Sequence, residues 1–409
     1  MILVLLKGSN SRVADMTVTS AAVARAAGIS DDAAKAVPKA KRPRDRRIDV
    51  FRGLALAMIF INHVPGTIFE HLTSRNFGFS DAAEGFVYIS GTSAALAYGE
   101  LMGQSRKWPG ISKIWSRAWT LYLVHMMITA WVIGIAAATL RLGGDPSLFT
   151  KDNVQVIFED MAGVLTGIPL MTHQIGYVNI LPMYAVLLLA CPWLILAARL
   201  APRLTVAASV ALWLLAGING LNLPNFPTNG GWFLNPISWQ LLFVLGLLTG
   251  LAIRKGERFV PKNIWLVVLS SGLLVLSLVW LKWPAFAAVA NATMGKAAAA
   301  GAPSLIRDFD KTFLSVPRLF HALALIYLLS TLGWVRDLCA SRWCEPLAIM
   351  GRNALPVFAL GTILSFAARS AKALGEASLY LDSLVIAGGV VFLWAFAKTL
   401  EYGRAAAKA

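Results

Sequence analysis

Long apolar segments recur along the chain from Val50 almost to its C-terminal end. Their hydrophobic positions are nearly continuous, whereas the strands of a membrane β-barrel alternate apolar and polar residues. An α-helix needs about 20 residues to cross the hydrocarbon core of a bilayer, and these segments contain about 17 to 25. We therefore predict an all-α polytopic membrane protein with about ten transmembrane helices. They fall near residues 50–66, 81–102, 114–139, 176–198, 204–219, 237–253, 264–282, 316–334, 346–368 and 379–397.

The pattern weakens in the segments that flank or interrupt these helices. The Ala-rich stretch 284–302 contains Pro284 and Lys296, so we expect a loop or a re-entrant piece there. The first residues are rich in Ala, Ser, Asp, Lys and Arg, a composition typical of disorder. The predicted organisation is a disordered basic cytoplasmic tail at 1–46, a transmembrane domain at 47–398 and a short cytoplasmic C-terminal tail at 399–409.

The composition supports the membrane class and excludes several others. Of the 409 residues, 57% are hydrophobic and 14% are charged, against about 25% charged residues in soluble domains. The three cysteines have neither disulfide-framework nor zinc-site spacing. The sequence contains no P-loop, dinucleotide fingerprint or hydrolase elbow. We expect no metal and no permanently bound cofactor.

The net charge of +16 indicates an orientation in the membrane rather than a nucleic-acid partner. With ten spans, 26 of the 37 basic residues fall on the side of the N-terminus and ten fall on the other side. Lys and Arg are enriched in cytoplasmic loops, so we predict that both termini are cytoplasmic. The basic run from Lys39 to Arg52 suits a cytoplasmic anchor on anionic membrane lipid.

The first predicted helix carries two ionisable residues that share one face. Arg52 and His63 are 11 positions apart, which is about 20° past three full turns and about 16.5 Å along the axis. One interpretation makes Arg52 part of the basic anchor and His63 an interfacial cap. The other makes His63 a general base near the outer end, with Arg52 binding a donor that enters from the cytoplasm.

Two carboxylates open the second predicted helix. Asp81 followed three residues later by Glu84 is the pattern of a capping box. Both lie among aromatic residues on the same predicted side as His63. One of them could also orient the imidazole and stabilise the imidazolium formed during proton transfer, as a carboxylate does in hydrolase triads.

Five further residues have both a chemical and a structural interpretation. Arg117 suits phosphate binding or simple positive-inside anchoring. Arg318 and His321 share a face and could bind an acceptor, or Arg318 could snorkel to the interface. Arg352 needs a partner, either a carboxylate or a bound phosphate. Trp232 belongs to a loop of aromatics and amides that suits a sugar surface or an interfacial aromatic belt.

Several of these segments together resemble a known family. They are RRIDVFRGLALAMIFINH (46–63), LTSRNFGFSDAAEGFVYISGTSAALAYG (72–99), HQIGYVNILPMYAVLLL (173–189), GGWFLNPISWQLLFVLGLLTG (230–250) and LAIMGRNALPVF (347–358). They resemble the OpgC-type membrane proteins that succinylate osmoregulated periplasmic glucans, over about residues 46 to 398. That family is similar to the broader integral-membrane acyltransferase 3 group, whose first helix also bears Arg-x10-His and whose core has ten helices.

The resemblance implies a transmembrane O-acyltransferase in the bacterial inner membrane. It implies that succinyl-CoA, or acetyl-CoA, is the cytoplasmic donor, with a hydroxyl of a periplasmic glucan as acceptor. It gives His63 the role of catalytic base and Arg52 that of donor binding, with Arg117 a looser match. Arg47 can complete a cationic mouth for CoA phosphates. The choice of succinyl as the acyl group rests on the resemblance alone, unless Arg318 or Arg352 binds the second carboxylate of the succinyl group.

Other functional classes remain as alternatives. A transporter or flippase for a glycan or lipid-linked sugar would need a continuous polar path and no acyl-CoA. A membrane scaffold would lose nothing but stability when His63 is replaced. The expected partners are membrane lipid, acyl-CoA and the periplasmic glucan, without nucleic acid, and a homo-oligomer is left open.

Overall fold

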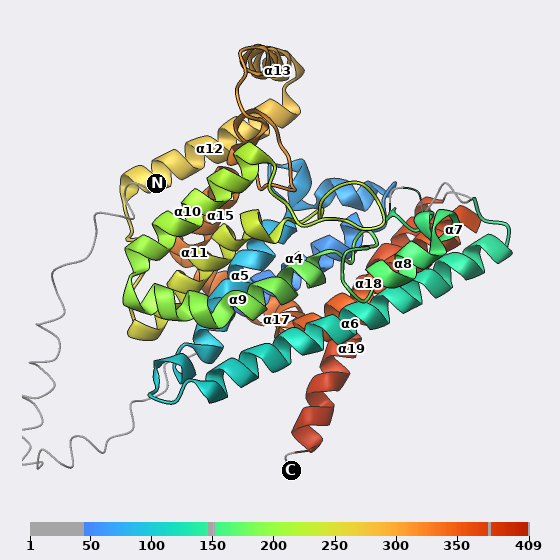
Figure 1. The fold of residues 1–409 in the computed structure, drawn as a ribbon, viewed down its shortest axis with the longest axis horizontal. Coiled ribbons are helices and arrows are strands. Elements are labelled where there is room, and N and C mark those ends of the chain that lie inside the picture. The colour runs from blue at the N-terminus through green and yellow to red at the C-terminus, as the bar shows by residue number, and fades with distance from the viewer. Residues whose placement is uncertain (1–44, 146–149, 151, 375–377, 408–409) are drawn as a thin grey trace, which may run out of the picture. The chain divides into compact units, whose positions relative to one another are not determined.

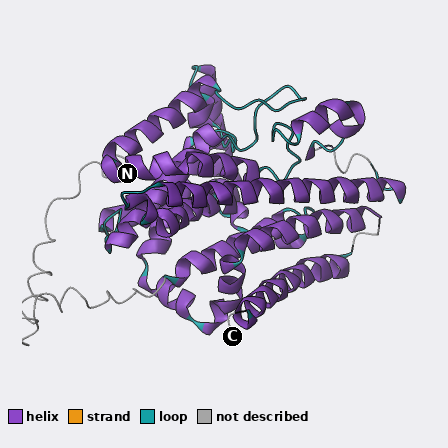
Figure 2. Cartoon of the chain, turned by 60° about the horizontal axis from the view of Figure 1, so that its bottom comes forward, coloured by secondary structure: helices purple, strands orange, loops and turns teal. Residues whose placement is uncertain are grey.

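The computed structural model describes residues 45–145, 150, 152–374 and 378–407. The chain divides into residues 1–45 and residues 46–409, and the description below concerns the second unit. The predicted tail at 1–46 thus lies outside the described residues, apart from its last two. Within the described residues the fold is all-α (Figure 2), and the one β-bridge joins Pro224 to Gly231.

Each of the ten predicted segments is helical, as Figure 1 shows. The corresponding helices are α4 (Arg46–Asn62), α5 (Ala82–Tyr98), α6 (Trp108–Arg141), α9 (Ile180–Leu200), α10 (Pro202–Asn219), α11 (Pro236–Lys255), α12 (Ile264–Lys282), α15 (Val316–Thr331), α17 (Glu345–Arg352) with α18 (Ala354–Leu374), and α19 (Leu379–Ala406). The shorter helices α7 (Val156–Glu159), α8 (Met161–Gly167), α14 (Ser304–Arg307) and α16 (Gly333–Ala340) lie between them.

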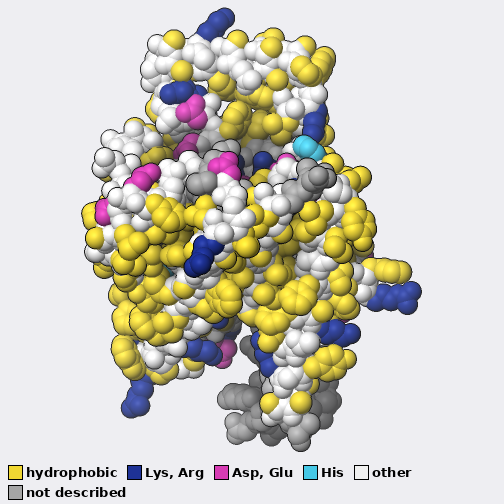
Figure 3. Space-filling model, turned by 90° about the vertical axis from the view of Figure 1, so that its right-hand side faces the viewer, with side chains coloured by type: hydrophobic (Ala, Val, Ile, Leu, Met, Phe, Trp, Pro, Cys, Tyr) yellow, Lys and Arg dark blue, Asp and Glu magenta, His cyan; other side chains and the backbone are white. Residues whose placement is uncertain are grey.

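The described helices define a multi-pass membrane protein. Seven of them, α6, α9, α10, α11, α12, α18 and α19, are long and apolar enough to cross a bilayer. The pair α15 and α16, bent by 74°, would make an eighth span if it crosses as one unit. Helices α4 and α5 have 17 residues each, one fewer than α10, which is the shortest of the seven. They are therefore not among the seven, and the number of ten transmembrane helices stays a prediction. Hydrophobic side chains dominate the face in Figure 3, with most charged side chains toward its two ends.

Three segments differ from the sequence-based expectations. The stretch expected as a loop or re-entrant piece contains helix α13 (Pro284–Ala299), because proline is accepted in the first turn and alanine favours the rest. The ninth predicted helix is broken at Asn353, between α17 and α18. Pro356 explains this break, since its ring clashes with the carbonyl four residues earlier. Helix α19 continues to Ala406 and takes up most of the predicted tail at 399–409.

Glycines let the central helices approach at backbone distance. A Cβ at Gly91 of α5 would clash with the carbonyl of Phe243 in α11, and one at Gly246 of α11 would clash with the carbonyl of Tyr88. Small residues at helix contacts are how membrane helices pack closely. The small-residue patch around Gly91 therefore holds α5 against α11, which fixes α5 beside α4.

Candidate functional site

Two cavities lie between α4, α5, α9 and α18; one is lined by Arg52 of α4 and the other by His63, which directly follows α4. The first, here named the Arg52 cavity, has an empty volume of about 830 Å³ including its mouth. The second, here named the His63 cavity, has about 1630 Å³ on the same measure. Because Arg52 lies within α4 and His63 directly follows its last residue, Asn62, the two cavities lie at different positions along the axis of α4.

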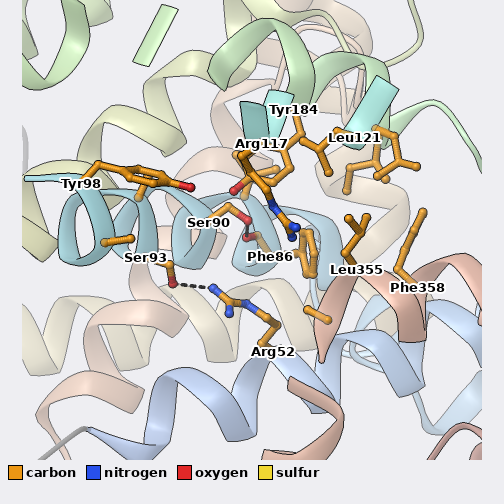
Figure 4. Close-up of a pocket in the computed structure, with 16 residues that line it drawn as sticks. Arg52, Phe86, Ser90, Ser93, Tyr98, Arg117, Leu121, Tyr184, Leu355 and Phe358 are labelled. Carbon is orange, nitrogen blue, oxygen red and sulfur yellow. Dashed lines mark hydrogen bonds between the residues drawn. The ribbon is translucent and has the colours of Figure 1, made fainter. Parts of the chain in front are cut away.

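The Arg52 cavity combines two guanidinium groups with apolar and phenolic walls. Arg52 from α4 and Arg117 from α6 both line it, as predicted for a cationic donor site, and both are partly buried (Figure 4). Arg52 Nη2 donates a hydrogen bond to Ser93 Oγ on α5. Tyr98 and Tyr184 add hydroxyl groups to the lining. Planar guanidinium groups bind phosphate oxygens through paired hydrogen bonds, so this cavity suits a phosphorylated or otherwise anionic ligand.

The imidazole of His63 sits at the wall of the second cavity, just after α4 ends. Its Nδ1 is buried and has no hydrogen-bond partner among the described residues, which leaves Nε2 to face the cavity. The ring of Tyr177 packs against the imidazole with 4.1 Å between centroids. Tyr177 has a φ of 68°, a left-handed conformation that is uncommon for a large side chain. Such strain is characteristic of functional sites, where the surrounding structure holds the residue in place.

A buried ion pair between Arg369 and Asp152 lies beside the ring of Tyr177. The Arg369 guanidinium lies 5.3 Å from the Tyr177 ring centroid, and Arg369 Nη2 lies 2.6 Å from Asp152 Oδ2. Both side chains of the pair are less than one-tenth exposed. Burial raises the pKa of Asp152 above its usual value, although the Arg369 charge opposes this shift. Asp152, Arg369 and Tyr177 thus form a packed series that ends at His63.

The two predicted carboxylates form both a helix cap and a charge cluster. Asp81 accepts a hydrogen bond from the Ala83 amide and Glu84 accepts one from the Asp81 amide, which confirms the capping box. Lys311 Nζ lies 2.6 Å from Asp81 Oδ2, and Arg318 Nε donates to Glu84 Oε1 at 2.8 Å. Asp81 lines the His63 cavity together with Lys311. The hydrogen bonds recorded for these carboxylates go to the cations and to the cap, and none reaches His63 among the described residues.

The structure separates the other predicted site residues from the two cavities. Arg47 donates to the Ser330 carbonyl at 2.9 Å. His321 is buried, with Nδ1 2.7 Å from Ser80 Oγ, and supports the loop before α5. Arg352 pairs with Glu401 at 2.7 Å and Glu345 at 2.8 Å, which supplies the carboxylate partners expected for it. None of these residues lines either cavity, and Arg318 contributes only through its contacts with Asp81 and Glu84.

The loop of aromatics and amides contributes to the His63 cavity through residues other than Trp232. Trp232 is buried at 4% exposure and is absent from the lining, whereas its neighbours Gly231 and Phe233 line the cavity. Phe233 is half exposed and lies 6.0 Å from Lys311 Nζ. The aromatic surface offered to a ligand is therefore Phe233.

Sequence reasoning missed several residues that line the His63 cavity. They come from loops between the long helices, where no apolar periodicity marks them: Arg75, Asp152, Asn153, Gln174, Tyr177, Asn179 and Lys311. The motif HQIGYVNI, noted only for its resemblance, contains three of them. Among the described residues, no group of three or more His, Cys, Asp and Glu side chains is arranged to hold a metal ion.

The fold and the two cavities define a multi-pass membrane protein with a cationic cavity beside α4 and a histidine-lined cavity where α4 ends. The model of the OpgC protein family matches residues 44–404, nearly the whole chain. The chain therefore belongs to the OpgC family. Membership supports a role in the modification of osmoregulated periplasmic glucans, in the class of glucan-modifying transferases. No curated protein matches the sequence.

Proposed function

We propose that this protein is a transmembrane O-acyltransferase that moves a succinyl group, or another short acyl group, from cytoplasmic acyl-CoA to hydroxyls of a periplasmic glucan. One observation carries the proposal: Arg52 of α4 and His63, which directly follows α4, line two different cavities that share Ile180 and Phe358 in their linings. A donor can thus be held in one cavity and an acceptor in the other. The family membership supplies the glucan.

The Arg52 cavity is the donor side of this proposal. Arg52 and Arg117 bind phosphate groups of CoA, and the apolar wall that includes Leu121 and Leu355 accommodates the pantetheine arm. The excess of Lys and Arg on the N-terminal side favours a cytoplasmic position for the Arg52 cavity in a bacterial inner membrane, and CoA thioesters occur in the cytoplasm. The thioester then points along α4 toward His63.

His63 acts as the general base in the proposed reaction. Its Nε2 accepts the proton of a glucan hydroxyl, and that oxygen attacks the thioester carbonyl. The C–O bond forms, the C–S bond breaks, and CoA leaves as a thiolate that the imidazolium can reprotonate. The packed series of Asp152, Arg369 and Tyr177 holds the ring in place.

The His63 cavity is the acceptor side. Its lining offers the exposed ring of Phe233 and five amide side chains, those of Asn62, Asn153, Gln174, Asn179 and Asn225. Amides both donate and accept hydrogen bonds, as the hydroxyls of a sugar require. A flat aromatic ring provides an apolar face for the sugar ring. This combination suits a carbohydrate better than an acyl chain or a nucleotide.

The experiment that tests the proposal measures group transfer directly. Purified protein in liposomes receives labelled succinyl-CoA on one side and oligomeric glucan on the other. We expect label on the glucan that depends on the protein. Transfer from acetyl-CoA in place of succinyl-CoA would keep the reaction and change the acyl group. Label on no glycan from either donor would contradict an acyltransferase and favour the transporter.

Arg52→Ala should weaken the use of the donor rather than the chemistry. Loss of hydrogen bonds to charged groups should raise the KM for acyl-CoA by about 10- to 100-fold, with a smaller change in kcat. Arg52→Lys should recover part of this loss, because it keeps the charge but not the planar fork. Arg203→Ala, an exposed arginine outside both cavities, is the matched control. An equal KM for Arg52→Ala and wild type would contradict the donor role.

The transporter reading receives less support from the geometry. It requires a continuous polar path, whereas the residues common to the linings of the Arg52 and His63 cavities, Ile180 and Phe358, are apolar. An acyl group on a thin arm can pass such a point more easily than a hydrated glycan can. The acyltransferase therefore accounts better for two cavities that meet at apolar side chains.

A further inference from the structure

The boundary between the Arg52 cavity and the His63 cavity consists of two apolar side chains. Ile180, the first residue of α9, and Phe358 of α18 each line both cavities. Their side chains are almost fully buried, at 6% and 4% exposure. The two cavities are thus in contact through Ile180 and Phe358, and these residues fill the space between them.

Along α4 and along α5, one part of the helix lines the Arg52 cavity and another part lines the His63 cavity. On α4, Arg52 belongs to the Arg52 cavity, and the lining of the His63 cavity begins at Ile59. On α5, which runs the opposite way, Ala83 lines the His63 cavity and Phe86 lines the Arg52 cavity. Of the four residues that flank the transition between the cavities on these two helices, Ile59, Ala83 and Phe86 are apolar and the fourth is Arg52.

On α9 and α18 the two linings meet at Ile180 and Phe358 themselves. Asn179 lines only the His63 cavity and Leu181 only the Arg52 cavity, with Ile180 between them. Leu355, one turn before Phe358 on α18, lines only the Arg52 cavity. The change of lining falls within about one turn on α5 and α9 and between Arg52 and Ile59 on α4, and Phe358 is where α18 reaches the His63 cavity; this is the geometry of a single constriction between two vestibules.

We propose that Ile180 and Phe358 form an apolar constriction that keeps the two vestibules separate and admits only a short acyl thioester from one to the other. The proposal rests on the proposed acyltransferase for its ligand, but its sealing role concerns the protein alone. Apolar side chains without polar partners exclude water and ions from a narrow passage. They would also restrict the acyl group by size, since there is little room beside a phenyl ring.

The sealing role is tested by thiol labelling in sealed vesicles, without any enzymatic reaction. Cys191, Cys339 and Cys344 are first replaced by serine, and single cysteines are then placed at Ser93 in the Arg52 cavity or Asn225 in the His63 cavity. A small membrane-impermeant thiol reagent should label each from one face only, and the two faces should be opposite.

Truncation at the constriction should remove this separation. In Phe358→Ala and Ile180→Ala backgrounds, both reporter cysteines should react from both faces, while each still reacts from its own face, which shows that the variant is folded. Leu355→Ala, the same kind of truncation one turn away, is the matched control and should keep the separation. Labelling from both faces in the parent protein, or separation that survives both alanine variants, would overturn the proposal.

The selectivity role is tested with acyl transfer. Phe358→Trp should lower transfer by about 10²-fold with unchanged binding of succinyl-CoA, because the thioester stops short of His63. Phe358→Ala should raise the rate with a longer dicarboxylic acyl-CoA relative to succinyl-CoA by about tenfold. An unchanged preference would overturn the selectivity role. If separation holds but no donor is used by the parent protein, the proposed function fails and the constriction stands.

Discussion

His63→Ala should reduce succinyl transfer to glucan by about 10²- to 10⁴-fold, the usual contribution of a positioned general base. Binding of succinyl-CoA should be unchanged, because Arg52 and Arg117, the residues proposed to bind the donor phosphates, line the other cavity. The imidazole also packs on Tyr177, so the alanine variant leaves a gap there. His63→Gln fills more of this space and should be equally inactive if the loss is chemical.

The measurement pairs single-turnover transfer with equilibrium binding of the donor. His71→Ala, an exposed histidine outside both cavities, is the control and should keep wild-type transfer. Wild-type turnover in His63→Ala would rule out the general base. Loss of donor binding together with transfer would mean that His63 only supports the fold. Labelled acyl groups retained on wild-type protein after rapid quenching would instead indicate an acyl-histidine intermediate.

The apolar pattern predicted the helices and the separation of Arg52 and His63 along the helix axis. A continuous hydrophobic segment crosses a bilayer as an α-helix, because every backbone amide must then be paired within the segment itself. The separation of Arg52 and His63 by three turns then follows from helix geometry. In the structure both side chains line cavities, Arg52 from within α4 and His63 from the residue that follows it.

The cavity walls were harder to predict, because they depend on long-range contacts. Asp152, Tyr177 and Lys311 lie in or next to loops, and chain position does not show which loops meet over His63. Asp81 and Glu84 were recognised as a cap, but their cations come from residues more than 200 positions later. The break at Asn353 had a local signal in Pro356, which continuous hydropathy across the segment outweighed.

Arg318→Met should destabilise the protein by about 3–5 kcal/mol, the usual cost of leaving a buried charge without its partner. Glu84 is fully buried, at 0% side-chain exposure, and Arg318 is its close cation at 11% exposure. Asp81 would keep Lys311 at 2.6 Å, so the loss falls on Glu84. Arg336→Met, which breaks an exposed pair with Asp337 at 69% and 72% exposure, should change the free energy of unfolding by no more than about 1 kcal/mol.

The comparison that distinguishes a charge effect from a packing effect is the double variant Arg318→Met with Glu84→Gln. With both charges removed, the protein should be less destabilised than with Arg318→Met alone, because no uncompensated carboxylate stays buried. Denaturant titrations in mixed micelles measure the free energy of unfolding of the parent protein, of the single variants Arg318→Met and Glu84→Gln, and of the double variant. An additive double variant would mean that the two side chains stabilise the fold independently. A coupled result would link the start of α5, and with it Asp81 in the His63 cavity, to a cation supplied by α15.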